Sequence, residues 1–145
     1  MEKRLQMVIE PKAKERPRAT IVGGHARIYT PHTTEGYEKE IRTAWIRQNG
    51  ETPFDGPVVM RIRCGMPIPK SATKTNKALM IAKKLRPTVK PDIDNLAKAI
   101  MDALNGVAYK DDNLIVDLVV RKFYTDAPCI AVAVSEWELK EGDKE

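Results

Sequence analysis

Two aspartates near the middle of the chain have the spacing that most directly suggests chemistry. Asp92 and Asp94 stand two positions apart, just after Pro91 and at the start of the helix-like segment DIDNLAKAIMDALNG. Where the backbone is extended, side chains two positions apart point to the same side. Two carboxylates so close repel each other unless a cation lies between them, and aspartate oxygens are the hard ligands that Mg²⁺ prefers. The competing interpretation is that these aspartates only cap the helix.

A second acidic pair, Asp111 and Asp112, follows the same helix-like segment and precedes an apolar stretch. The chain can therefore return this pair to the neighbourhood of Asp92 and Asp94 and complete a metal site. The sequence K-D-D-N is also typical of an ordinary turn, so turn chemistry alone is the alternative explanation.

Lys98 lies one helical turn after Asp94, on the same side of the expected helix. Its ammonium group could reach a scissile phosphate and stabilise the charge that develops there. The simpler explanation is an ion pair at helical spacing. Asp102, one turn further on, is expected to be a solvated partner of Lys98 rather than a metal ligand.

A strongly basic segment, residues 66–90, leads directly into this acidic region. It contains no acid and seven basic residues: Lys70, Lys74, Lys77, Lys83, Lys84, Arg86 and Lys90. We expect the segment to bind the phosphate backbone of DNA, as either an ordered or a mobile loop. The alternative is that its charges only solvate a loop. A second basic patch would widen the surface; it comprises Lys12, Lys14, Arg16 and Arg18.

The elements that must position these residues form an α/β or α+β pattern. Strands are expected at residues 5–10, 19–22, 26–29, 57–64, 114–122 and 129–136, and helices at residues 33–49 and 92–106, with a short helix within 78–85. The last two strands, separated by the turn-like TDAP, are expected to pair as an antiparallel hairpin. Asp94 is expected to cap the helix at residues 92–106, and Gly106 to end it.

These elements predict one domain, residues 1–145, with a mixed or antiparallel sheet and two or three packed helices. The tail, residues 139–145, is expected to fray.

Composition narrows the class of protein. The 145 residues include 25 lysines and arginines against 20 acids, a formal net charge of +5 that is compatible with a polyanionic partner. Cys64, Cys129, His25 and His32 lack the spacing of metal ligands, so a zinc site is not expected. No apolar run is long enough to cross a membrane and no signal peptide opens the chain, which predicts a cytoplasmic protein. Aromatic residues make up only 6% of the chain, which disfavours the stacking of single-stranded bases.

The arrangement D-x-D-N-L-x-K, followed by D-A-L-N-G and then D-D before a strand, resembles the RusA family of Holliday-junction resolvases from phages and prophages. The resemblance is strongest over residues 90–124 and extends, through K-E-R-P-R at residues 14–18 and Y-T-P-x-x-T-x-x-Y-E at residues 29–38, to most of residues 7–135.

This resemblance implies a RusA-like fold and a homodimeric, Mg²⁺-requiring enzyme that makes paired symmetric nicks in four-way DNA junctions. By position, Asp92, Asp94 and Asp112 match the catalytic aspartates, Lys98 matches the essential lysine, and Asp111 is only a candidate ligand. In the mechanism so implied, the metal orients and activates a water, and the metal and Lys98 stabilise the charge at phosphorus. Mn²⁺ is expected to substitute for Mg²⁺, and no small-molecule cofactor is expected.

Three other interpretations remain open at this point. The chain could be a nuclease for other branched DNA, or a protein that binds junctions or duplexes without cutting them. It could also be a structural partner of a replisome or phage protein, which would have no affinity for DNA.

Overall fold

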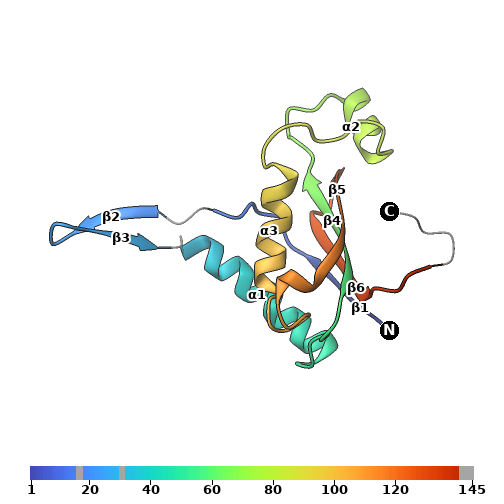
Figure 1. Ribbon diagram of the computed structural model, residues 1–145. Coiled ribbons are helices and arrows are strands. Elements are labelled where there is room, and N and C mark those ends of the chain that lie inside the picture. Colours follow the sequence, from blue (N-terminus) through green and yellow to red (C-terminus); the bar gives the residue numbers. More distant parts are fainter. Residues whose placement is uncertain (16–17, 30–31, 141–145) are drawn as a thin grey trace.

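A four-stranded mixed sheet with the helices α1 (His32–Asn49) and α3 (Ile93–Ala103) packed on one face organises the chain (Figure 1). The computed structural model describes residues 1–15, 18–29 and 32–140. In chain order the elements are β1 (Glu2–Val8), β2 (Arg18–Val22), β3 (His25–Tyr29), α1 (His32–Asn49), β4 (Val58–Pro67), α2 (Lys74–Ile81), α3 (Ile93–Ala103), a 3₁₀ turn (Asp112–Leu114), β5 (Ile115–Thr125) and β6 (Cys129–Glu136). This arrangement confirms the predicted α/β class.

The core lies between the sheet and the two longer helices, α1 and α3. Along β4 every second side chain from Val58 to Cys64 is buried, and their register partners on β6, such as Val132 and Val134, are buried on the same face. From the helices, Trp45 and Ile100 are fully buried against them. The alternation of two along the strands and the helical spacing along α1 and α3 therefore meet in one apolar layer.

The strand order, β1-β6-β4-β5, contradicts the predicted hairpin between the last two strands. β4 lies between β5 and β6, pairing parallel with β5 and antiparallel with β6. The turn residues 126–128 therefore cross the end of β4 instead of closing a two-stranded hairpin. Gly65 makes room for this crossing, because a Cβ at its position would lie 2.7 Å from Thr125 Cγ2 and 2.9 Å from Cys129 Sγ.

α3 is the helix that the sequence predicts best, although its first residue differs from the expectation. Leu96, Ala97 and Ile100 are buried at helical spacing, as predicted. The helix begins at Ile93, so the N-cap is Asp92 and not Asp94. Its C-cap is Leu104, and Gly106 follows with the positive φ of 83° that favours glycine in a turn.

The remaining elements refine the predicted boundaries. β2 and β3 form a separate two-stranded hairpin that extends away from the sheet (Figure 1). The short helix α2 begins earlier than predicted because Thr73 caps it, accepting a hydrogen bond from the backbone of Asn76. Met80 is its one buried residue, whereas Leu79 and Ile81 are exposed. In the tail, residues 141–145 lie outside the described residues. Across the described chain, no helix is both long and apolar enough to cross a membrane.

Candidate active site

Asp92 and Asp94 stand at the N-terminal end of α3 with their side chains exposed. The backbone is extended at Asp92 (φ −70°, ψ 149°) but helical from Ile93 onward. The expectation that an extended backbone aims both side chains to one side therefore fails after the first of them. Asp92 occupies the N-cap position without making the capping hydrogen bond. Among the described residues, Asp94 accepts only from the backbone of Asn95, at 2.9 Å. Capping therefore does not account for Asp92, whose charge the positive end of the helix favours.

Lys122, on β5, holds the backbone immediately before Asp92. Its Nζ donates to the carbonyl oxygens of Val89 and Pro91, at 3.0 and 2.9 Å. The sequence interpretation missed this role. The available signal was a lysine at a helix-facing position of a largely apolar strand, where an ammonium group needs acceptors.

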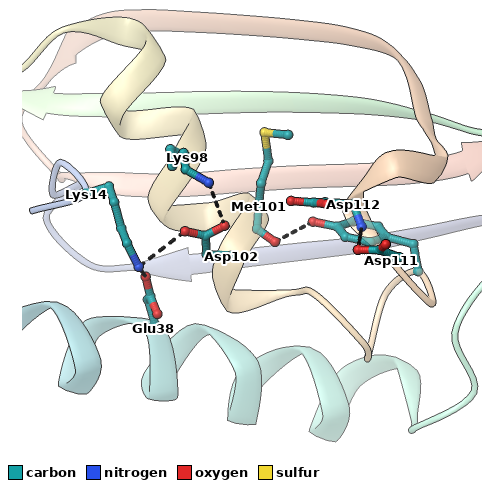
Figure 2. Close-up of polar contacts among 8 residues, drawn as sticks. Lys14, Glu38, Lys98, Met101, Asp102, Asp111 and Asp112 are labelled. Atoms are coloured by element: carbon teal, nitrogen blue, oxygen red, sulfur yellow. Dashed lines mark hydrogen bonds and ion pairs between the residues drawn. The ribbon is translucent and has the colours of Figure 1, made fainter. Parts of the chain in front are cut away.

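Lys98 is bound to Asp102 one turn further along α3, with 3.1 Å between Nζ and Oδ1 (Figure 2). This confirms the expected pairing, and the Lys98 side chain remains 59% exposed. The second oxygen of Asp102 lies 3.2 Å from the Nζ of Lys14, which also donates to Glu38 on α1. This network links α3, α1 and the segment before β2.

Lys14 is therefore not a free cation for DNA, contrary to its place in the predicted second basic patch. Burial lowers its pKa, but hydrogen bonds from its ammonium group to Glu38 and Asp102 raise the pKa by more, so the net shift is upward. Of the other members, Lys12 is exposed, Arg18 begins β2, and Arg16 lies outside the described residues.

The second acidic pair lies beside the C-terminal part of α3 (Figure 2). The Asp111 carboxylate accepts from the backbone of Asp112 at 2.8 Å and caps the 3₁₀ turn. The fully buried Tyr109 donates its hydroxyl hydrogen to the carbonyl oxygen of Met101 at 2.7 Å. Burial raises the pKa of Tyr109, and the nearby carboxylates of Asp112 and Asp102 raise it further. Asp111 thus has a structural role, whereas the Asp112 side chain makes no hydrogen bond or ion pair with any described residue.

The seven basic residues of the segment before α3 are all exposed: Lys70, Lys74, Lys77, Lys83, Lys84, Arg86 and Lys90. None of them forms an ion pair with a described residue. Arg86 donates to the carbonyl oxygen of Lys122 at 3.2 Å, and the Lys83 ammonium lies 5.1 Å from the centre of the Phe123 ring. Because Lys122 also holds the backbone before Asp92, the basic segment and the first acidic pair meet at this end of β5.

A cavity of about 420 Å³ lies at the same place. Ala13, Lys90, Pro91, Asp92 and Asn95 line it. A cation and a free carboxylate thus border one hollow, next to a cation-rich surface.

Comparison with known proteins identifies the family. The sequence pattern described as endodeoxyribonuclease RusA matches residues 9–135. The chain belongs to the RusA endodeoxyribonuclease family. The chain is also 39% identical over 129 residues to the uncharacterized protein YqaN of Bacillus subtilis (strain 168), covering 88% of this chain and 91% of that protein. RusA membership implies an endonuclease of the Holliday-junction type and suggests branched DNA as partner and a divalent metal as cofactor.

The RusA-type aspartates do not gather into one three-carboxylate site within a single chain. Met101 follows Asp92 by nine positions along α3, a rise of roughly 13 Å. Asp112 lies at the Met101 end, near the Tyr109 hydroxyl that donates to the Met101 carbonyl oxygen (Figure 2). No group of three acidic, cysteine or histidine side chains among the described residues lies close enough to hold a metal ion. Mg²⁺ is often bound by one or two carboxylates together with phosphate oxygens of the substrate. Asp92 and Asp94 fit that mode, and Asp112 lies apart from them within the described part of the same chain.

Proposed function

We propose that this chain is a Mg²⁺-dependent, structure-selective endodeoxyribonuclease that resolves four-way junctions by paired symmetric nicks, in DNA recombination and repair. The observation that carries the proposal is the free, exposed carboxylate of Asp92, which borders one cavity with Lys90 and lies beside the basic segment. A protein that only binds DNA would not need an uncompensated carboxylate there, because it repels phosphate. RusA-family membership supports a branched junction as the form of DNA.

The basic segment, Lys98 and the aspartates have different roles in the proposed reaction. The exposed cations of residues 66–90 bind the phosphate backbone and set the register of the DNA, without reading its sequence. Lys98, oriented by Asp102, stabilises charge on the scissile phosphate. Asp92 and Asp94 would hold a divalent ion, which when bound acts as a Lewis acid at the phosphate and makes water more acidic. Asp112 is proposed as the third catalytic aspartate; Asp111, which caps the 3₁₀ turn, is the weaker candidate.

The test is strand-by-strand mapping of cuts in a mobile four-way junction and in linear duplex of the same sequence. With Mg²⁺ or Mn²⁺ we expect symmetric nicks in two opposed strands of the junction and little cutting of the duplex. Ca²⁺ should permit binding with little cleavage. Cutting in excess chelator would contradict the metal requirement, and equal cutting of duplex would contradict the selectivity. Tight binding without nicks would support the alternative of a junction-binding protein.

The contribution of the basic segment is measured by the salt dependence of junction binding. Replacing Lys74, Lys77 and Lys84 by alanine should weaken binding of every DNA sequence alike. The slope of log affinity against log salt should shrink by about 0.9 for each phosphate that the variant no longer neutralises. Lys39→Ala, an exposed lysine on α1, is the matched control and should leave the slope unchanged. An unchanged slope in the triple variant would assign these lysines to solvent.

A further inference from the structure

β5 presents a free edge of the sheet. It stands at one end of the strand order, and its backbone pairs with β4 alone among the described elements. β1, at the other end, is protected: three consecutive charged residues occupy its start, and Asn49 Nδ2 donates to the carbonyl oxygen of Arg4 at 3.0 Å. Charged side chains and covering groups are the usual protection of an edge strand. β5 has no such run of consecutive charges, and no described side chain is seen to bond its backbone between Val116 and Arg121.

The exposed part of this edge is apolar and has definite limits. Val116, Leu118 and Val119 are 54%, 43% and 41% exposed, and neighbouring exposed apolar residues are typical of an interaction surface. The pairing with β4 shifts between Ile115 and Asp117, which marks a bulge at the start of the strand. At the other end, Arg86 covers the carbonyl oxygen of Lys122. The regular, uncovered stretch is therefore Asp117–Arg121, with Val119 at its centre.

Two charges of opposite sign, Asp117 and Arg121, stand at the two ends of this stretch. Asp117 and Arg121 are exposed and share the face of the sheet that the helices leave open, since their register partners are Val59 and Arg63. Neither forms an ion pair with a described residue. Four residues of strand hold them about 13 Å apart, too far to pair with each other. Arg121 also lies beside Arg63, and such like-charged neighbours are destabilising.

We propose that the β5 edge pairs antiparallel with the β5 edge of a second copy of this chain, around a two-fold axis at Val119. This register sets Asp117 opposite the partner's Arg121 and Arg121 opposite the partner's Asp117. It also sets Leu118 opposite the partner's Val120. Each exposed charge then gains an opposite charge across the strands, and Leu118 and Val119 of both copies become covered.

Other even registers match the strand less well. A shift by two residues in either direction sets both charges opposite apolar residues. A shift by four sets Asp117 opposite its own copy, or Arg121 opposite its own copy, and like charges directly opposite each other are destabilising. The register that pairs the charges is also the one centred on the uncovered stretch. The proposal names the contact surface of the homodimer that the RusA resemblance implies. It rests on the proposed function through the paired symmetric nicks, which two copies of one active site would make.

The first test is sedimentation of charge variants without DNA. Asp117→Arg and Arg121→Asp should each weaken the dimer by about tenfold or more, since each creates two like-charged contacts. An equimolar mixture of the two single variants should regain the dimer, because every contact in the mixed pair joins opposite charges. The double variant should also regain it. Arg4→Asp, the same charge change on the other edge strand, is the control and should have no effect.

The second test is a covalent one that does not depend on these charges. In a Cys129→Ala background, Val119→Cys should form an intermolecular disulfide on mild oxidation, because the two-fold axis brings its two copies within roughly 5 Å. Asp117→Cys should not, since its copies would lie about 13 Å apart. A dimer that neither test perturbs would overturn this interface alone. A monomer at all concentrations would overturn both the interface and the homodimer, whereas dimers without junction cleavage would count against the nuclease only.

Discussion

Asp92→Asn is expected to lower the rate of junction cleavage about 100- to 1,000-fold. The substitution keeps the size and shape of the side chain but removes one negative charge from the pair that would hold the divalent ion. A metal Lewis acid supplies several kcal/mol of transition-state stabilisation, and roughly 3–4 kcal/mol corresponds to this loss. Single-turnover cleavage of a labelled four-way junction with saturating Mg²⁺ measures it.

Asp92→Asn should leave the stability of the fold unchanged and should not lower the protein's affinity for DNA. Asparagine occupies an N-cap about as well as aspartate, and Asp92 makes no capping bond to lose, so the free energy of unfolding should stay unchanged. In chelator, junction affinity should be equal or higher, because one charge that repels phosphate is gone. Lys98→Ala should also cut slowly but, having lost a cation, should show no gain in affinity.

Glu51→Gln is the matched control. Glu51 is an exposed acid just after the C-terminal end of α1, outside the candidate site, so the cleavage rate should equal that of the wild type. Two further variants, Asp112→Asn and Asp111→Asn, distinguish the roles of the two aspartates of the second acidic pair. Slow cleavage is expected for Asp112→Asn, whereas Asp111→Asn should cut well because asparagine still caps the 3₁₀ turn. A near wild-type rate for Asp92→Asn would mean that Asp92 has only a structural role at the start of α3. The proposed function would then lose its chemical basis.

Ile100→Ala is expected to lower the free energy of unfolding by about 2–5 kcal/mol, the usual cost of emptying a fully buried isoleucine site. Ile100 lies in the middle of the buried stripe of α3, and the cavity would form between this helix and the sheet. Urea unfolding followed by circular dichroism measures the change.

Ile93→Ala is the matched control on the same helix. Ile93 is 40% exposed at the first position of α3, so its truncation should cost far less than that of Ile100. Equal losses for the two variants would mean that α3 packs on the sheet through a different face.

Local patterns in the sequence determined the elements and the chemistry-bearing residues. The spacing of Leu96, Ala97 and Ile100 reports a buried helical face, because core-facing residues in a helix recur every three or four positions. Alternation along β4 reports a strand with one buried face in the same way. The motif from Asp92 to Lys98 indicates the RusA family, since it is carried by residue types at fixed positions, whatever their contacts.

The partners of those elements were decided only in the tertiary structure. Periodicity shows which face of a strand is buried but not which strand lies beside it, so the sequence suggested a hairpin where β4 separates β5 from β6. A turn signal such as TDAP reports a local reversal, and a reversal is compatible with either arrangement. Room for the crossing depends on Gly65, which is remote in sequence from the turn.

The same holds for the candidate site, where the sequence identified the residues and the tertiary structure placed them. Charge and residue type marked Asp92, Asp94 and Asp112, but the length of α3 sets the two acidic pairs apart, and only the path of the chain after the helix shows at which end the second pair lies. Likewise, a lysine in a sequence is simply a cation. Packing makes Lys14 the buried partner of two carboxylates, and it makes Lys122 the support of the backbone before Asp92, because each is surrounded by acceptors that come from distant parts of the chain.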